Sequence, residues 1–263
     1  MSNASVILSE FADGVTTITL NRPEKRNALN SELLAALPQA LVEADGDERV
    51  LAIVLTGSDP AFCAGLDLKE LGSTAANLSS GEPVETQGHR GAPWPVMTKP
   101  VIGAINGAAV TGGLEVALQC DFLIASERAG FADTHARVGV MPAWGLTVLL
   151  PQAIGLRRAK EMSLTGNFVG ATEALALGLV NHVVPHHELL PAAIGLARDI
   201  ASNDANGVAT ILASYKESAL TTAGEAVQIE QRVARTWRER TFDPAEVERR
   251  RTAVIARGRA QTS

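Results

Sequence analysis

Short apolar runs alternate with helical stripes along most of the chain. Residues 51–55 are apolar throughout and stop close to Gly57. Residues 100–105 and 122–125 have the same character. Runs of this length are typical of strands that are buried on both faces of a parallel sheet. Because such strands alternate with helical segments, the pattern predicts an α/β protein.

The N-terminal part of the chain predicts a β-hairpin followed by a helix. Residues 6–9 and 15–20 are rich in β-branched residues and flank an Asp-Gly pair, which favours a hairpin. Asn30 can cap a helix whose apolar stripe would face the core. Pro38 lies inside this helix and is expected to kink it. The stripe consists of Leu33, Leu34, Leu37 and Leu41.

Two regions depart from this alternation. Between residues 73 and 95, Ser, Thr, Gly and Pro dominate, which predicts a mobile loop or a short helix. After Pro185 the pattern is mostly helical. We therefore divide the chain into an α/β core of residues 1–200 and a C-terminal helical region of residues 201–263 for packing and oligomerisation, with no linker to mark the boundary.

Composition and charge narrow the possible classes of protein. With 46% hydrophobic and 20% charged residues, the 263-residue chain is typical of a globular protein with a substantial core. Its net charge of −6 argues against general nucleic-acid binding, which depends on basic residues. Cys63 and Cys120 have no spacing that suggests a disulfide framework or a metal site, so a reducing cytoplasm is the simplest compartment.

No membrane segment is predicted. Residues 1–10 lack the basic start and apolar core of a signal peptide. Residues 101–118 are strongly apolar, but Asn106, Thr111 and Glu115 interrupt them. A buried strand, a tight turn and a buried helix explain this run better than a membrane span does.

Two glycine-containing segments carry the candidate chemistry. Residues 61–68 and 111–115 each place small residues where a strand is expected to turn into a helix. Amides at a helix start have no partner inside the helix, and the helix dipole favours negative charge there. Two such starts that face each other would form a two-donor pocket for an enolate oxyanion. Glu115, one turn into the second helix, could transfer a proton beside that pocket.

Several ordered motifs resemble the enoyl-CoA hydratase/isomerase (crotonase) family, and the likeness extends from about residue 6 to residue 185. The motifs are Thr17-Ile18-Thr19-Leu20-Asn21-Arg22-Pro23, Arg26-Asn27-Ala28-Leu29, residues 62–68, Lys99-Pro100-Val101-Ile102 and the run from Asn106-Gly107 to Asp121. The resemblance implies a spiral of repeated ββα units and reactions of acyl-CoA thioesters. It also implies no cofactor beyond the coenzyme A of the substrate, and a homotrimer or a dimer of trimers.

The resemblance assigns the oxyanion donors to the amides of Leu66 and Gly112. Gly112 suits this role because a thioester oxygen can approach its backbone with no Cβ in the way. Leu66 needs to contribute only its amide. Ala64 and Leu68 are expected to line the channel for the thioester arm. Asp67 is grouped with them, although a structural role at a helix start is the preferred interpretation.

Glu115 is the first candidate catalytic carboxylate, and a buried glutamate satisfied by hydrogen bonds is the alternative. Hydratases of the family carry a second glutamate between a phenylalanine and a glycine. Here Phe131 and Gly139 bracket His135 at that place. A histidine exchanges protons near neutral pH, so His135 can be paired with Glu115. A buried hydrogen bond without chemistry, or Asp133 acting instead, remains an alternative.

The acyl and coenzyme A contacts are less sharply defined. Trp144 is expected either to floor the acyl pocket or to be a core or interface aromatic. Arg22, Lys25 and Arg26 form the basic cluster nearest the family motif, and Arg26 is expected to meet a phosphate beside Ala28. A solvated turn is the alternative.

Together these features predict an enoyl-CoA hydratase that binds no nucleic acid, membrane or metal. An isomerase, or a lyase or decarboxylase, could use the same enolate pocket. A non-catalytic acyl-CoA-binding protein is the alternative from another class, because His135 replaces the second glutamate. Fold alone does not choose among these activities.

Overall fold

The computed structural model describes residues 5–80, 91–203, 205–213 and 215–216, together with residues 235, 238–239, 243–245, 248–249, 251–252, 255–256 and 259. The predicted loop or short helix at residues 73–95 contains a short helix, α3 (Ala76–Ser80), and residues 81–90 lie outside the described part. Residues 205–213 are helical, as predicted for the C-terminal region, most of which lies outside the described residues. The division at residue 200 therefore stays a prediction.

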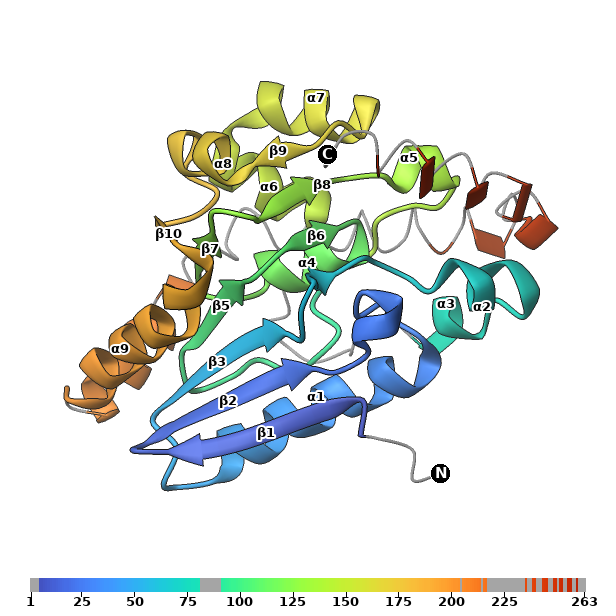
Figure 1. Ribbon diagram of the computed structural model, residues 1–263. Helices are drawn as coiled ribbons and strands as arrows, with labels where there is room; N and C mark the ends of the chain where they lie inside the picture. Colours follow the sequence, from blue (N-terminus) through green and yellow to red (C-terminus); the bar gives the residue numbers. More distant parts are fainter. Residues whose placement is uncertain are drawn as a thin grey trace.

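Within the described residues, six strands form the main sheet in the order β1-β2-β3-β5-β7-β10 (Figure 1). β1 and β2 make the predicted antiparallel hairpin, and every other neighbouring pair is parallel. β3 and β5 are buried at every residue, as predicted from their apolar runs. The strands are β1 (Ile7–Ala12), β2 (Val15–Leu20), β3 (Ala52–Gly57), β5 (Val101–Ile105), β7 (Phe122–Ser126) and β10 (His182–Val184).

A second, smaller sheet has the order β4-β6-β8-β9, in which β4, β6 and β8 are parallel and β9 is antiparallel. β4, β6 and β8 each follow a main-sheet strand along the chain, and each leads into a helix: α2, α4 and α5. The chain therefore makes three successive ββα turns, which confirms the predicted spiral. The elements are β4 (Ala61–Cys63), β6 (Ala108–Val110), β8 (Gly130–Ala132), β9 (Val169–Gly170), α2 (Leu68–Ser73), α4 (Gly112–Leu118) and α5 (His135–Val138).

Helices cover both faces of the main sheet because its side chains alternate between two cores. Ala52 and Val54 of β3 pack with α9 (Leu189–Ala201), whereas Ile53 and Leu55 point into the larger core. That larger core includes the predicted leucine stripe of α1 (Ser31–Gly46) and residues of the second sheet. α1 begins at Asn30, whose side chain accepts the Leu33 amide at 3.0 Å, and the helix continues through Pro38.

α6 (Leu146–Ile154), α7 (Leu156–Thr165) and α8 (Ala171–Leu177) lie beside the second sheet (Figure 1). The short 3-10 helices η1 (Pro23–Lys25) and η2 (His186–Glu188) instead follow β2 and β10 of the main sheet. Among the described residues, no helix is both long and apolar enough to cross a membrane. Because β4, β6 and β8 run parallel in one sheet, the helix starts that follow them gather at one edge of it.

Candidate active site

Leu66 lies just ahead of the first helix start, two residues before α2 begins, and its amide faces away from the neighbouring chain segment. Leu29 pairs with Leu66 in an isolated parallel bridge. The bridge uses the Leu29 amide, which donates to the Gly65 carbonyl at 2.8 Å, and the Asp67 amide, which donates to the Leu29 carbonyl at 2.9 Å. Successive amides of an extended segment point in opposite directions, so the Leu66 amide points the other way. It donates no hydrogen bond to any described residue.

The second helix start contributes the amide of Gly112, the first residue of α4. An amide at this place has no carbonyl one turn earlier to bind. The two starts are close neighbours, because a Cβ placed on Gly65 would lie 3.5 Å from the Gly112 nitrogen. Glycine at residue 113 makes this approach possible, since a Cβ there would lie 2.1 Å from the Cys63 carbonyl oxygen. The predicted pair of helix starts is therefore brought together.

Thr111 turns the backbone between β6 and α4 in an unusual conformation, with φ 55° and ψ −115°. A non-glycine residue at positive φ costs about 1–3 kcal/mol, so surrounding contacts must hold it. Its amide donates to the Ala132 carbonyl at 2.8 Å. Its hydroxyl lies 2.5 Å from the Thr134 hydroxyl and accepts the Thr134 amide at 3.3 Å. The end of β8 thus fixes the direction of the Gly112 amide.

Glu115 lies one turn into α4 and is buried, with 3% of its surface exposed. Its Oε1 accepts the backbone amides of Trp144 at 2.8 Å and Ala143 at 3.2 Å. Its Oε2 lies 3.4 Å from Nε2 of His135. One carboxylate oxygen is therefore held by main-chain donors, and the other faces the histidine.

His135 begins α5 and lies between two carboxylates. Its Nδ1 is 2.6 Å from Oδ1 of Asp133, and its backbone amide donates to the same oxygen at 3.1 Å. Asp133 and His135 are both buried, and the Asp133 carboxylate also accepts the hydroxyl of Ser163 from α7. Glu115, His135 and Asp133, which the sequence offered partly as alternatives, thus form one chain of contacts.

The charges in this chain of contacts support one another. Burial favours a neutral imidazole, but the charge of Glu115 and the hydrogen bond to Asp133 outweigh it and raise the pKa of His135 to about 10. Burial also opposes ionisation of Asp133, yet the hydrogen bond and charge of His135 hold the pKa of that carboxyl below its usual value. At neutral pH the ring of His135 is therefore an imidazolium next to the carboxylate of Asp133.

Trp144 joins the two parts of the site. Its indole Cζ3 would lie 3.4 Å from a Cβ placed on Gly112, so the ring sits beside that glycine. The residue is 4% exposed, its amide holds Glu115, and its carbonyl accepts Nε2 of Gln119 at 2.6 Å. The Trp144 side chain is therefore buried in the core and also lies beside the start of α4.

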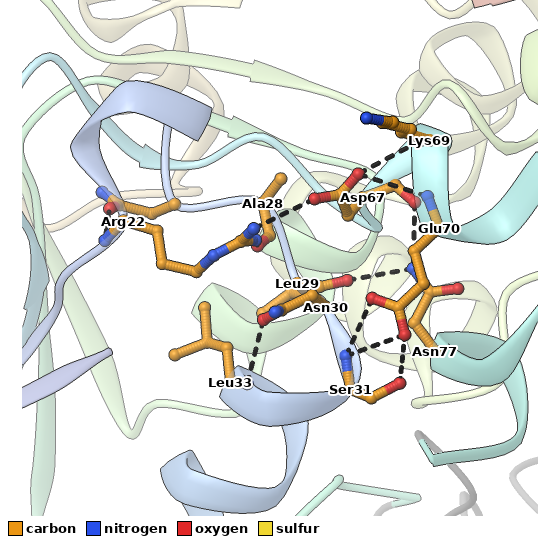
Figure 2. Close-up of polar contacts among 11 residues, drawn as sticks. Arg22, Ala28, Leu29, Asn30, Ser31, Leu33, Asp67, Lys69, Glu70 and Asn77 are labelled. Carbon is orange, nitrogen blue, oxygen red and sulfur yellow. Dashed lines mark hydrogen bonds and ion pairs between the residues drawn. The ribbon is translucent and has the colours of Figure 1, made fainter. Parts of the chain in front are cut away.

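The predicted basic cluster divides into one engaged and two exposed side chains. Arg22 contacts Asp67 Oδ2 at 3.1 Å and also donates to the carbonyl of Ala28 (Figure 2). Lys25 and Arg26 are exposed. Asp67 also caps α2 by accepting the amides of residues 69 and 70 at 3.1 and 3.4 Å, which agrees with its preferred structural interpretation.

Further contacts clamp the first helix start to α1. Nδ2 of Asn77 donates to the carbonyls of Leu29 and Asp67 at 3.1 and 3.0 Å (Figure 2). The carboxylate of Glu70 accepts the amide of Ser31 at 3.3 and 3.2 Å. Ala28 is buried, and Ala64 and Leu68 are half-buried beside this clamp. These contacts hold residues 64–68 in place.

Sequence reasoning missed the contacts that orient Glu115 and His135. The pairing of Asp133 with the backbone and side chain of His135 has a local signal, because an aspartate two residues before a helix residue often accepts its amide. The Ala143 and Trp144 amides have no such signal, since they come from a distant loop. Across the described part of the chain, no group of three His, Cys, Asp or Glu side chains is arranged to hold a metal ion.

A second polar cluster has the residue types of a catalytic triad but not its accessibility. Nδ1 of His186 lies 3.0 Å from Oγ of Ser126, and its Nε2 lies 3.0 Å from Oδ2 of Asp59. Ser126 is fully buried and its hydroxyl also accepts the Arg128 amide at 3.1 Å. The cluster therefore links loops at one end of the main sheet and exposes no nucleophile.

Comparison with known proteins gives the family. The enoyl-CoA hydratase/isomerase family model matches residues 10–252. A probable peroxisomal enoyl-CoA hydratase 1 of Arabidopsis thaliana is 38% identical over 237 residues, covering 90% of this chain and 88% of the plant protein. The crystal structure of an enoyl-CoA hydratase from Mycobacterium smegmatis is 50% identical with a TM-score of 0.81, covering 90% of this chain and 99% of that one. The chain belongs to the enoyl-CoA hydratase/isomerase family.

The fold is likewise that of the crotonase group. A monofunctional enoyl-CoA isomerase from M. smegmatis is 30% identical with a TM-score of 0.69, and the match covers 86% of this chain and 99% of that one. Proteins named for two different reactions thus share this fold. The activity has to be argued from the residues of the site.

Proposed function

We propose that the protein catalyses the reversible addition of water to a 2-enoyl-CoA thioester. The observation that carries the proposal is Glu115, whose Oε2 faces Nε2 of His135 at 3.4 Å, one turn from the Gly112 amide. The names of relatives that are 38–50% identical also support hydration.

In this proposal the amides of Leu66 and Gly112 hold the thioester oxygen. Negative charge grows on that oxygen as the enolate forms, and fixed donors bind it more strongly than they bind the ground-state carbonyl. Removing one such donor typically lowers the rate by about 10²- to 10³-fold. Asp67 serves this pocket indirectly, by capping α2 next to Leu66.

Glu115 and His135 divide the two proton transfers. The Glu115 carboxylate accepts a proton from water as the water oxygen bonds to the β-carbon. The imidazolium of His135 donates the proton that the α-carbon receives. Proton exchange between Glu115 Oε2 and His135 Nε2 then restores both groups, so that H and OH have been added across the double bond.

Glu115→Gln tests this assignment against a non-catalytic binder. We expect a loss of at least about 100-fold in kcat for 2-enoyl-CoA hydration, because the amide cannot accept the water proton. Glu161→Gln is the matched control, since Glu161 is exposed and pairs with Arg158 on the same helix. A wild-type protein that binds acyl-CoA and hydrates none of a series of short- to long-chain 2-enoyl-CoAs would contradict the proposal.

Isomerisation is the second candidate because the same pair can move a proton between the α- and γ-carbons of a 3-enoyl-CoA. The similarity to the M. smegmatis isomerase favours testing it. Parallel assays with 2-enoyl- and 3-enoyl-CoA substrates separate the two activities. Faster turnover of the 3-enoyl substrate would replace the hydratase assignment with an isomerase one. A lyase or decarboxylase would be recognised by release of a shortened acyl-CoA.

Arg26 is the better candidate for a coenzyme A phosphate than Arg22, which is occupied by Asp67 and Ala28. Ala64 and Leu68 would line the thioester arm. We expect Arg26→Ala to raise KM for a CoA thioester several-fold. KM for a pantetheine thioester, which lacks the nucleotide phosphates, should not change. Equal effects on both substrates would exclude the phosphate contact.

The acyl chain would enter beside Trp144, whose ring neighbours Gly112. A bulky aromatic at this place would limit the chain that fits between the oxyanion donors and the core. The groups named so far supply all proton transfers, so no cofactor beyond the coenzyme A of the substrate is proposed. Full activity after dialysis against a chelator is the expected result, and a loss restored by a divalent cation would contradict it.

We expect a homotrimer or a dimer of trimers. Leu156 and Leu164 of α7 are 58% and 78% exposed, and Leu175 of α8 is 43% exposed. Covering a leucine side chain contributes about 1.5–3 kcal/mol, which favours an interface on these helices. Sedimentation that finds only a 27.6 kDa species would contradict this expectation. A reducing compartment such as the cytoplasm fits the two unpaired, buried thiols of Cys63 and Cys120.

A further inference from the structure

We propose that Asp133 is a positioning residue of the reaction, and that Asp133 and His135 together replace the neutral carboxylic acid that a second glutamate would supply. This inference rests on the proposed function. Its geometric basis is the line of contacts from Asp133 Oδ1 to His135 Nδ1 at 2.6 Å and from His135 Nε2 to Glu115 Oε2 at 3.4 Å.

The first role of Asp133 is to fix which nitrogen of His135 exchanges a proton. A carboxylate only accepts hydrogen bonds at neutral pH, so the Nδ1 that faces it at 2.6 Å carries hydrogen in every protonation state. The exchangeable proton therefore resides on Nε2, which faces Glu115. The backbone bond from His135 to the same carboxylate oxygen, at 3.1 Å, fixes the position of that oxygen.

The second role concerns the charge of the site. Two adjacent buried carboxyl groups share one proton, because like charges disfavour double ionisation, and their total charge is then −1. Here the carboxylates of Glu115 and Asp133 and the imidazolium of His135 also sum to −1. If His135 were present without Asp133, the total charge of the site would be zero. Asp133 thus preserves the charge of a two-carboxyl site while the acid becomes an imidazolium.

The third role is to prevent His135 and Glu115 from neutralising each other. In a buried ion pair, transfer of the proton from imidazolium to carboxylate relieves the penalty of burying two charges. That transfer would consume the acid and the base at once. The negative charge of Asp133 stabilises the imidazolium and opposes the transfer, so both groups keep the protonation states that hydration needs.

The surroundings of His135 contain no competing charge in the described structure. Glu115 of α4 and Asp133 are the charged groups that face the ring, and Asp133 is in turn contacted by Ser163 of α7. The guanidinium of Arg137, on the same helix α5, is directed to the Thr165 carbonyl and the Asn167 side chain. Asp133 is therefore the group whose removal changes the electrostatic environment of His135 on its Nδ1 side.

Asp133→Asn is the central test because asparagine can still accept from Nδ1 but carries no charge. We expect kcat for hydration to fall about 10- to 100-fold, with KM changed less than about threefold. The high-pH limb of the kcat profile should move to lower pH by at least one unit, because the imidazolium loses a stabilising charge. Asp199→Asn, an exposed site on α9, is the matched control.

A spectroscopic readout keeps this test independent of turnover. The chain has five histidines, and the nitrogen-15 signals of His135 are identified by their absence in His135→Gln. In the wild type at pH 8 we expect a doubly protonated ring with a strongly downfield Nδ1 hydrogen. In Asp133→Asn we expect the ring to lose its second proton at a pH at least one unit lower than in the wild type. Identical titration of His135 in both proteins overturns the inference, whatever the activity.

Two further variants separate positioning from folding. In the His135→Gln background, Asp133→Asn should change kcat less than about twofold if Asp133 acts through the imidazole. A purely structural aspartate would reduce activity in both backgrounds. If Asp133→Asn does not fold, Asp133→Glu retains the charge and should keep the imidazolium signal; a neutral ring there overturns the inference. Absence of hydration in the wild type, with the imidazolium signal intact, would instead reject the proposed function alone.

Discussion

Replacing His135 by glutamate would gather three carboxyl groups in one buried cluster. In the wild type, Nε2 and Nδ1 of the ring lie 3.4 Å from Glu115 and 2.6 Å from Asp133, so a carboxylate would turn two attractions into two repulsions. Each repulsion is on the order of 4 kcal/mol for charges about 4 Å apart at an effective dielectric constant of about 20. Uptake of a proton limits the total, because raising a carboxyl pKa from about 4 to 7 costs roughly 4 kcal/mol. We expect His135→Glu to lower the free energy of unfolding at pH 7 by about 3–4 kcal/mol.

Urea unfolding followed by circular dichroism, at one protomer concentration, measures this change. At pH 5 the difference from the wild type should shrink, because the extra proton binds more easily. Adding Asp133→Asn to His135→Glu removes one charge and should recover about half of the lost stability. Asp133→Asn should also raise the rate of hydration in the His135→Glu protein, whereas the same substitution in the wild type should lower that rate.

The opposite signs of these two effects are the decisive observation. If Asp133→Asn lowers activity in both backgrounds, Asp133 acts through its backbone bond and Ser163 rather than through its charge. A His135→Glu protein as stable as the wild type at pH 7 would also refute the electrostatic reasoning. Asp199→Asn should be silent in both backgrounds.

Other predictions concern pH, packing and substrate size. Because the folded pKa of His135 is raised to about 10, its stabilising contribution is complete below the unfolded value near 6.5 and is lost as the pH rises through about 10. The melting temperature of the wild type should therefore fall more between pH 7 and 10 than that of His135→Gln; parallel curves would contradict this. Gly113→Ala forces a Cβ to 2.1 Å from the Cys63 carbonyl oxygen, so it should lower the free energy of unfolding by about 1–3 kcal/mol and reduce kcat. Gly195→Ala, with open space around it, should leave the free energy of unfolding unchanged or raise it in urea titrations. Trp144→Ala should raise kcat/KM for long-chain relative to short-chain 2-enoyl-CoAs, and an unchanged ratio would place the acyl pocket elsewhere.

Local sequence signals were sufficient for most elements of the fold. The hairpin, the strands at residues 52–57 and 101–105, and the Asn30 cap of α1 depend on neighbouring residues, and all are present. Residue spacing was also sufficient to single out His135 opposite Glu115, because the ordered family motifs place both residues. The kink expected at Pro38 stays a prediction, since α1 runs as one helix from Ser31 to Gly46 with this proline inside it.

The tertiary structure decided how these residues meet. Leu66, Gly112 and His135 are far apart in the sequence, and they become neighbours because β4, β6 and β8 lie parallel in one small sheet with a helix start after each. Main-chain donors from residues 143–144 then hold one oxygen of Glu115. Hydrophobic patterning specifies which face of an element is buried, but it carries no information on which distant elements share a sheet. The amino-acid sequence determined the elements and the chemical groups; the packing of three ββα units determined the site.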